Sequence, residues 1–274
     1  MSTAGISPVE LRSEFRAPEI DPARPLPDHT QLPDSDGEIS PNFQEPPQRT
    51  LLTDPIVPHL ERLRPDGDFC VGRDNGIYWT LTDPPLNGAV SPDWFVVLGV
   101  PRSLAGKPRR SYVLWYEHVP PCIILEFVSG DGRAERDSTP QKGKYWIYEQ
   151  AIGAEYYGIY EVDLDRIEMY RLVNGRYERQ TPNAEGRFPI APLGLELGIW
   201  RGTYEGFDLP WMRWWYPDGT LLPTHEELAL LANDRAAAEH RRAEAEKVRA
   251  EAENQRAERL AAQLRALGID PDDD

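Results

Sequence analysis

An apolar run, Cys122-Ile123-Ile124-Leu125-Glu126-Phe127-Val128, is the stretch of this 274-residue chain that decides the fold. Near-continuous hydrophobic runs of this length are typical of β-strands buried on both faces of a covered sheet. Glu126 interrupts the run, and an unpaired carboxylate at such a position is energetically expensive. A cation, a metal ion or a proton must compensate it, which makes Glu126 the first candidate for a functional residue.

A second acid lies immediately before another predicted strand. Asp93 follows Pro92 and immediately precedes the apolar run Trp94-Phe95-Val96-Val97-Leu98. A proline at the start of a strand directs the chain without removing an interior ladder bond. If the two strands are neighbours, Asp93 and Glu126 can converge on one divalent ion, because Mg²⁺ takes one or two carboxylates plus water and phosphate oxygens.

A cationic side chain follows in the next predicted helix, which spans residues 141–152. Lys144 and Tyr148 are four positions apart in it, so they share one helix face. An ammonium group can stabilise developing charge or orient an attacking water. Two acids from strands and a lysine from the following helix therefore predict a metal-dependent phosphodiesterase site.

The overall charge argues against easy binding to nucleic acid. The chain has 30 Lys and Arg residues against 46 Asp and Glu residues, a formal net charge of −16. Non-specific affinity for nucleic acid comes mainly from Lys and Arg. Basic residues gather at 102–110 and at 133–144, and these two groups are either parts of a local basic groove or solvated loops.

The cysteines, histidines and apolar segments exclude several other classes of protein. Two cysteines and five histidines without ligand spacing do not support a disulfide framework or a zinc site. We find no signal-like N-terminal stretch and no window that approaches eighteen apolar residues. These features predict a cytoplasmic protein without a membrane-spanning segment.

Composition divides the chain into four segments. Residues 1–49 are rich in proline and acids and are predicted to be disordered, because they cannot bury enough apolar surface. Residues 50–222 are predicted to form one globular domain, which begins with a short helix that includes Ile56 to Arg64. Residues 223–268 are predicted to form a long charged helix, and residues 269–274 an acidic tail.

Strands in the globular segment are predicted from apolar runs between Gly, Pro and Asp turns. They comprise residues 77–81, 94–98, 112–116, 122–128, 156–162, 166–172 and 177–180. The dipeptide Asn174-Gly175 predicts a tight hairpin turn. The tryptophans after Pro210 are predicted to close the domain against the sheet, since packing explains such aromatics most simply.

The sequence defines where the charged helix starts but leaves open whether the helix associates with another chain. Thr224 and Glu227 form a capping box, and no Gly or Pro follows before Gly268. One seven-residue series is apolar from Ala229 to Leu264, but the series three positions on contains three glutamates. A strong coiled coil needs both series apolar. Residues 225–267 are therefore either a single charged helix or the contact segment of a homodimer or protein partner.

The order of these motifs resembles that of a known family. Ser91-Pro92-Asp93, Glu126 within its strand, Lys144 with Tyr148, and Glu155-Tyr156-Tyr157 are similar to the Uma-two family of restriction endonucleases, in the PD-(D/E)xK nuclease superfamily. The resemblance covers residues 52 to 215. It implies an α/β (α+β) fold: a restriction-endonuclease-like mixed central sheet flanked by helices, here with a long C-terminal helix.

The resemblance also implies an activity, a metal and its ligands. The activity is hydrolysis of DNA phosphodiester bonds by an endonuclease that uses Mg²⁺, with Mn²⁺ as an alternative. Asp93 and Glu126 match the two acids of the motif, and the backbone carbonyl of Phe127 would be an additional metal ligand.

Comparison with the superfamily suggests two further candidate site residues. Val128 stands where the superfamily signature has lysine, so Lys144 is the candidate for a lysine that has moved to the following helix, with Lys142 as its rival. A glutamate from the first helix sometimes completes such sites, and Glu61 is the nearest candidate. The alternative function is a nuclease-fold interaction protein with a weak or idle site, which assembles through its C-terminal helix.

Overall fold

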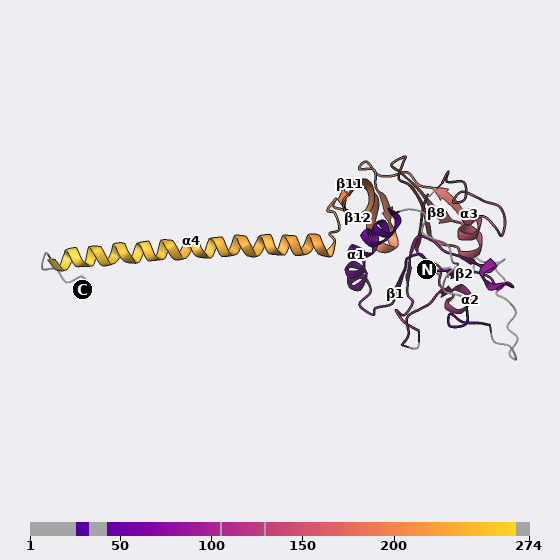
Figure 1. Ribbon diagram of the computed structural model, residues 1–274, viewed down its shortest axis with the longest axis horizontal. Coiled ribbons are helices and arrows are strands. Elements are labelled where there is room, and N and C mark those ends of the chain that lie inside the picture. The colour runs from indigo at the N-terminus through magenta and orange to yellow at the C-terminus, as the bar shows by residue number, and fades with distance from the viewer. Residues whose placement is uncertain (1–25, 33–42, 105, 129, 267–274) are drawn as a thin grey trace, which may run out of the picture. The chain divides into compact units, whose positions relative to one another are not determined.

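The computed structural model describes residues 26–32, 43–104, 106–128 and 130–266 (Figure 1). The chain divides into two compact units, Met1–Leu222 and Pro223–Asp274. Most of the segment predicted to be disordered lies outside the described residues, as does the acidic tail.

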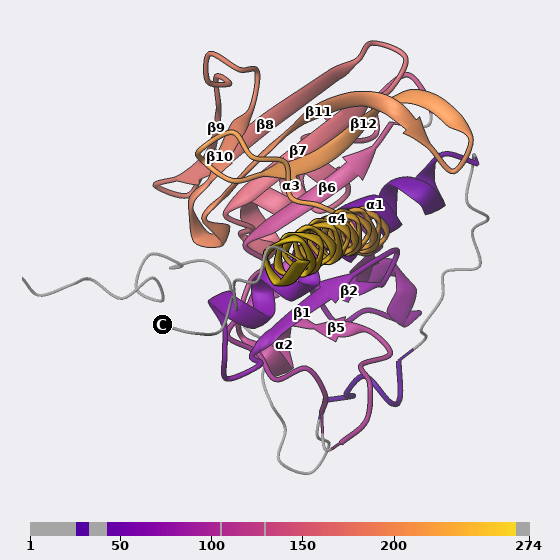
Figure 2. The same ribbon diagram turned by 90° about the vertical axis from the view of Figure 1, so that its left-hand side faces the viewer.

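A six-stranded mixed sheet organises the first unit, in the order β1-β4-β6-β7-β8-β9. Its strands are β1 (Phe69–Gly72), β4 (Trp94–Leu98), β6 (Ile123–Phe127), β7 (Tyr156–Glu161), β8 (Arg166–Val173) and β9 (Arg176–Arg179). β6 and β7 pair in parallel and the other neighbours pair antiparallel, and Figure 2 shows β6, β7 and β8 side by side. Every residue of β6 is buried, as its apolar sequence predicts.

Two three-stranded sheets accompany the central one. One has the order β3-β2-β5 and contains β2 (Ile77–Tyr78), β3 (Ala89–Val90) and β5 (Tyr112–Val113). The other contains β10 (Phe188–Ile190), β11 (Leu195–Tyr204) and β12 (Phe207–Trp215). Sequence analysis did not predict β1, β3, β10, β11 or β12. It did predict that the tryptophans of β12 close the domain, and Trp214 packs on Trp94 with ring centroids 5.7 Å apart.

Helices cover both faces of the central sheet. On one face α1 (Glu45–Leu63) contributes Leu52 and Ile56 to a core with Trp94. On the other face, α3 (Lys144–Trp146) and the π-helix η3 (Ile147–Ile152) bring Tyr148 into a core with Phe95. The alternation of side chains along β4 produces this division. The predicted mixed sheet flanked by helices is confirmed.

The first helix begins earlier than the sequence predicts. α1 begins at Glu45 rather than near Ile56, so it includes residues that we expected to be disordered. Prolines in its first turn are tolerated because the N–H groups there have no partner within the helix. Gln48 exchanges two 3.0 Å hydrogen bonds with the backbone of Met212, and α1 lies beside β12 (Figure 1). Tertiary contacts therefore extend the helix.

The predicted strand at 112–116 is only partly correct. β5 ends at Val113, and the short helix α2 (Leu114–Glu117) follows it. His118 ends that helix in the left-handed conformation, with φ of 57°. A short apolar run does not by itself distinguish a strand from a buried helical turn, and in this case a helical turn buries Trp115 against Tyr78.

The predicted hairpin is confirmed. Asn174 and Gly175 connect β8 to β9 with φ values of 49° and 79°, and Val173 pairs with Arg176. Two consecutive positive φ values define the turn type that Asn-Gly favours.

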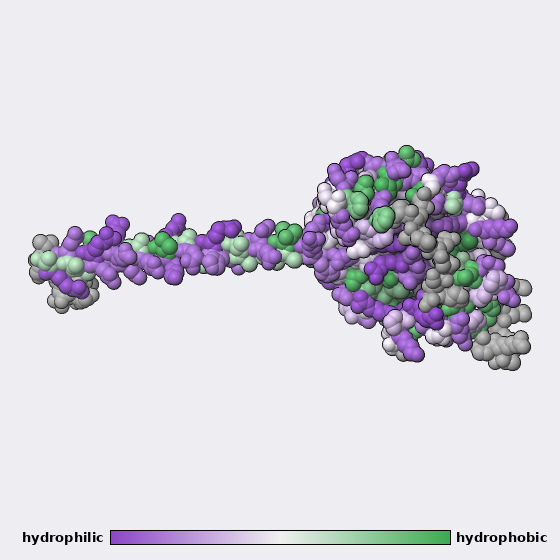
Figure 3. Space-filling model, in the orientation of Figure 1, coloured by the Kyte–Doolittle hydropathy of each residue, from purple (hydrophilic) through white to green (hydrophobic). Residues whose placement is uncertain are grey.

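The second unit contains one helix, α4 (His225–Ala266), among its described residues. The capping box is confirmed: the N–H of Glu227 donates to Thr224 Oγ1 at 3.2 Å, and the N–H of Thr224 donates to Glu227 Oε2 at 2.8 Å. None of the residues of α4 is buried, and its visible side is largely hydrophilic (Figure 3). Across the described part of the chain, no helix combines the length and the apolar character that crossing a membrane requires.

Candidate active site

Strand pairing brings the two candidate acids together. Trp94 of β4 lies opposite Leu125 of β6, so continuing the antiparallel register by one pair places Asp93 opposite Glu126. Residues directly opposite one another in such a ladder have side chains on the same face. Asp93 Oδ2 also accepts a 2.6 Å hydrogen bond from the backbone N–H of Phe127. The two carboxylates therefore lie near each other where β6 ends and β4 begins.

Glu126 is almost completely buried, with 1% of its surface exposed. Its Oε2 accepts a 2.9 Å bond from Lys144 Nζ, and its Oε1 accepts a hydrogen bond from the Tyr148 hydroxyl. Burial raises the pKa of Glu126 to about 8; Lys144 and the Tyr148 hydrogen bond lower it, and Asp93 raises it further. Burial is therefore the main reason that the pKa of Glu126 is raised.

Lys144, not Lys142, is the lysine that contacts Glu126. Lys142 is exposed in the turn before α3. Burial by itself would lower the pKa of Lys144, but the charge of Glu126 and the hydrogen bond to it raise that pKa above its ordinary value. Lys144 is therefore a cation at neutral pH.

The N-terminal turns of α1 add residues that sequence analysis missed. Arg49 Nη2 lies 2.7 Å from Asp93 Oδ1 and 3.0 Å from Glu45 Oε2, and Arg49 Nη1 lies 3.3 Å from Asp74 Oδ2. Burial raises the pKa of Glu45 to about 7; Asp93 raises it further and Arg49 lowers it. The helical spacing of Glu45, Arg49, Leu52 and Ile56 was the available signal, but the surrounding prolines outweighed it.

Glu61, the predicted acid of the first helix, is not part of this group. It pairs with Arg102 at 3.1 Å, and both side chains are about half exposed. The acid of α1 that reaches the site is Glu45, which pairs with the same arginine as Asp93.

Most arginines of the two predicted basic groups form ion pairs within the fold. Four of their five arginines pair with acids of the same unit: Arg102 with Glu61, Arg109 with Glu117, Arg133 with Asp131, and Arg136 with Glu161 and Glu168. Arg109 and Glu117 are themselves buried. These four arginines therefore do not add a strongly basic surface.

The donor set of the site matches a hard divalent cation. Among the described residues, no group of three or more His, Cys, Asp and Glu side chains has the geometry to hold a metal ion. Asp93 and Glu126 are the two carboxylates that strand pairing places together. The continued register places Pro92 opposite Phe127, and proline has no N–H to donate to the Phe127 carbonyl. The N–H and C=O of a strand residue point to the same side, so this carbonyl faces Asp93. Mg²⁺ is commonly bound by such a small set, completed by water and phosphate oxygens.

The charged groups around the site are a second test of whether it fits a divalent cation. Glu45, Asp74 and Asp93 each contact Arg49, and Glu126 contacts Lys144. A divalent cation bound by Asp93 and Glu126 would add positive charge close to these acids. Burial is the largest cause of the raised pKa of both Glu45 and Glu126, and the charge of Asp93 raises both further.

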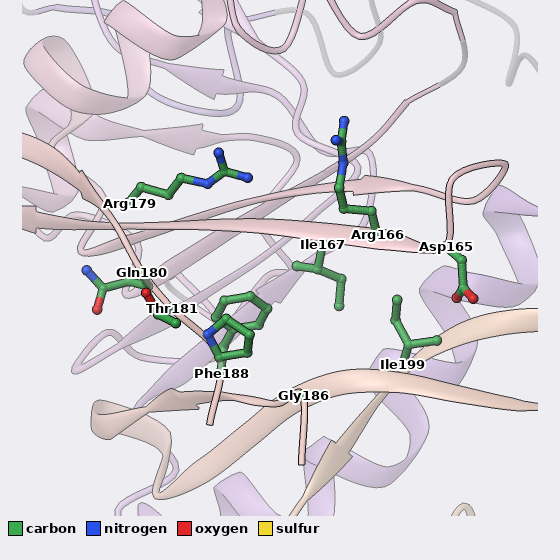
Figure 4. Close-up of a pocket in the computed structure, with 10 residues that line it drawn as sticks. Asp165, Arg166, Ile167, Arg179, Gln180, Thr181, Gly186, Phe188 and Ile199 are labelled. Atoms are coloured by element: carbon green, nitrogen blue, oxygen red, sulfur yellow. The ribbon is translucent and has the colours of Figure 1, made fainter. Parts of the chain in front are cut away.

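A separate cavity of about 450 Å³ lies along β8 (Figure 4). Its lining includes Asp165, Arg166, Arg179 and Phe188. Arg166 pairs with Glu161 and Glu168, and Asp165 pairs with Arg201. None of Asp93, Glu126 and Lys144 lines this cavity, so it is distinct from the candidate site.

The fold and the site define a class: a mixed-sheet α+β protein with two acids and a lysine grouped at one end of the sheet. Within that class, the chain belongs to the Uma2 family, described as "Putative restriction endonuclease", whose model matches residues 25–209. The resemblance inferred from the sequence is confirmed. A restriction-endonuclease-like nuclease is the function that this family indicates.

One solved structure that the chain resembles is that of "a putative nuclease belonging to DUF820 from Anabaena variabilis ATCC 29413", determined by crystallography at 1.96 Å resolution. The match covers 61% of this chain and 91% of that chain, with 12% sequence identity and a TM-score of 0.40. No curated protein matches the chain.

Proposed function

We propose that the chain is a divalent-metal-dependent endonuclease that hydrolyses DNA phosphodiester bonds. The observation that supports this most strongly is the grouping of Asp93, Glu126 and Lys144 at one end of the central sheet. Asp93 and Glu126, with the carbonyl of Phe127, would hold Mg²⁺ or Mn²⁺. Membership of the Uma2 family supports the same reading.

A purely structural role explains this group less well. A buried ion pair such as Glu126–Lys144 adds little to stability, because desolvation offsets the attraction between the charges. A pair that served only folding would also be balanced in charge. Here the charge of Asp93 raises the pKa of both Glu126 and Glu45.

The chemistry assigns different tasks to the side chains. When bound, the metal ion would stabilise negative charge on the oxygens of the scissile phosphate. Lys144 acts as a cation rather than a general base, because Glu126 keeps it protonated. Its side chain is 33% exposed whereas that of Glu126 is 1% exposed, so the ammonium group is the member of the pair that can meet the phosphate or orient the attacking water. Water attacks phosphorus in line with the leaving oxygen.

Cleavage of supercoiled plasmid in Mg²⁺, Mn²⁺ or EDTA tests the proposal. We expect metal-dependent nicking by the wild-type chain and its loss in Asp93→Asn, Glu126→Gln and Lys144→Met. Glu61→Gln is the matched control, because it neutralises an exposed acid outside the site. Cleavage that survives Glu126→Gln, or a wild-type chain that neither cleaves DNA nor binds Mg²⁺ or Mn²⁺, would contradict the proposal.

The second candidate function is an interaction protein that assembles through α4. The observation that favours it is a helix of 42 residues with no buried side chain among them. A net charge of −16 also favours a protein partner over nucleic acid. Light scattering after size exclusion, on the full chain and on one that ends at Leu222, distinguishes the two. A dimer that becomes a monomer on truncation supports assembly through α4, and an unchanged number of subunits contradicts it. The predicted cytoplasmic location remains part of this proposal.

A further inference from the structure

Arg49 is buried among three acids at the candidate site. Its side chain is 11% exposed, and Nη2 contacts both Asp93 Oδ1 and Glu45 Oε2, at 2.7 and 3.0 Å. Nη1 contacts Asp74 Oδ2 at 3.3 Å. A cation is therefore already placed against one of the two carboxylates proposed to bind metal.

We propose that Arg49 is the built-in counter-ion of Asp93 and competes with the divalent cation for that carboxylate, so that Arg49 sets the metal affinity of the site. The inference rests on the proposed function, because it presupposes that Asp93 is a metal ligand.

Arg49 occupies one of the two oxygens of Asp93, and the Phe127 N–H contacts the other. Oδ2 accepts the Phe127 N–H at 2.6 Å, which fixes the orientation of the carboxylate. Oδ1 is the oxygen that Arg49 contacts. A guanidinium group stays charged at every pH at which the protein is folded. Its unit of positive charge beside a ligand oxygen must weaken the binding of any other cation to that oxygen.

Arg49 can release Asp93 without losing all of its acidic partners. Nη2 is shared between Asp93 and Glu45, and Nη1 contacts Asp74. Asp74 is held close by the backbone, because its N–H donates to the carbonyl of Asp93 at 3.2 Å. When Asp93 turns to a metal ion, Glu45 and Asp74 still compensate the guanidinium.

Mn²⁺ binding to the full chain tests the inference without reference to cleavage. Electron paramagnetic resonance measures free Mn²⁺ at constant pH and ionic strength for the wild type, Arg49→Gln, Arg102→Gln and Glu126→Gln. We expect Arg49→Gln to bind Mn²⁺ about tenfold more tightly than wild type, because one positive charge beside the site is removed. Arg102→Gln removes the same charge from an exposed pair with Glu61, and its affinity should stay near that of wild type.

The outcomes separate this inference from the proposed function. If the folded Arg49→Gln variant binds Mn²⁺ no more tightly than the wild type, Arg49 does not compete with the metal ion for Asp93. The proposed metal site is retained in that case if Glu126→Gln binds Mn²⁺ more weakly than the wild type. Absence of binding in the wild type, or binding unchanged in Glu126→Gln, overturns both.

A second measurement covers the case in which Arg49→Gln does not fold. Crystal structures of the wild-type chain with and without Mn²⁺ should differ at one contact: Arg49 Nη2 should lie beyond hydrogen-bond distance of Asp93 Oδ1 when Mn²⁺ is bound. A contact that persists in the presence of Mn²⁺ overturns the inference.

Discussion

Asp93 Oδ2 accepts the backbone N–H of Phe127 at 2.6 Å, so the first acid of the site is fastened to the strand that contains the second. This bond lies next to Pro92, which has no N–H to continue the ladder between β4 and β6. The position of Asp93 therefore depends on β6 and not only on the loop before β4. Asp93 therefore has a structural contribution that can be separated from its proposed role as a ligand.

Two substitutions of Asp93 should separate these contributions. Asp93→Ala leaves the Phe127 N–H without its acceptor and should reduce the free energy of unfolding by about 1–3 kcal/mol. Asp93→Asn retains an oxygen acceptor and should reduce stability less, yet it should abolish metal binding equally. Urea unfolding and Mn²⁺ titration measure the two effects. Equal loss of stability in both variants would show that the charge, not the acceptor, stabilises the fold.

Tyr148→Phe should affect the site through Glu126. The hydroxyl of this fully buried tyrosine donates to Glu126 Oε1, so its removal frees the carboxylate to rotate. Loss of such a supporting contact typically lowers metal affinity or activity by about 10–100-fold. Tyr157→Phe is the matched control, because Tyr157 is equally buried but its hydroxyl donates to the carbonyl of Glu135 at 2.7 Å.

The two tyrosine variants should differ in Mn²⁺ binding and cleavage, not in stability. Each loses one buried hydrogen bond, which should reduce the free energy of unfolding by about 1 kcal/mol. If Tyr157→Phe impairs Mn²⁺ binding as strongly as Tyr148→Phe, then general loosening of the tyrosine cluster is the cause.

Gly143→Ala should displace Lys144. Gly143 immediately precedes α3, and a Cβ there would lie 2.0 Å from the backbone oxygen of Asp137. Backbone atoms cannot yield as a flexible side chain can, so we expect a loss of about 1–3 kcal/mol in stability and impaired cleavage. Gly130→Ala is the control in the same connection, because a Cβ there meets nothing within 4 Å. Thermal unfolding of both variants provides the comparison, and an unperturbed Gly143→Ala would contradict the close approach.

His59 should make stability depend on pH. Its Nε2–H donates to the carbonyl of Leu193 at 2.7 Å, and burial lowers its pKa below the ordinary 6.5. A lowered pKa means that the unfolded chain takes up a proton before the folded protein does. The contribution of His59 is therefore complete above pH 6.5 and is lost as the pH falls below it.

His59→Gln isolates this effect from the other titrating groups. The stability difference between wild type and His59→Gln, measured by urea unfolding, should be larger at about pH 7.5 than at about pH 5. A difference that is the same at both pH values would show that the pKa of His59 is not lowered by folding.

Local sequence determined the elements that present the central residues of the site. The apolar runs of β4 and β6 predicted both strands, because a near-continuous hydrophobic segment has few alternatives to a buried strand. Turn and cap chemistry predicted the Asn174-Gly175 hairpin and the Thr224–Glu227 capping box. Helical spacing put Lys144 and Tyr148 on one face, and both contact Glu126. Their roles in metal binding and cleavage remain predictions.

Tertiary structure alone decided what surrounds Asp93. Gln48 and Met212, which hold the start of α1 in place, are 164 positions apart, and no local pattern contains such a contact. That contact helps to order the turn that contains Glu45 and Arg49, and packing of α1 in the core that contains Trp94 then places Arg49 beside Asp93. Local periodicity in the sequence predicts which residues share one face of a helix or strand. The interactions among charged side chains depend on distances between segments that only the folded chain brings together.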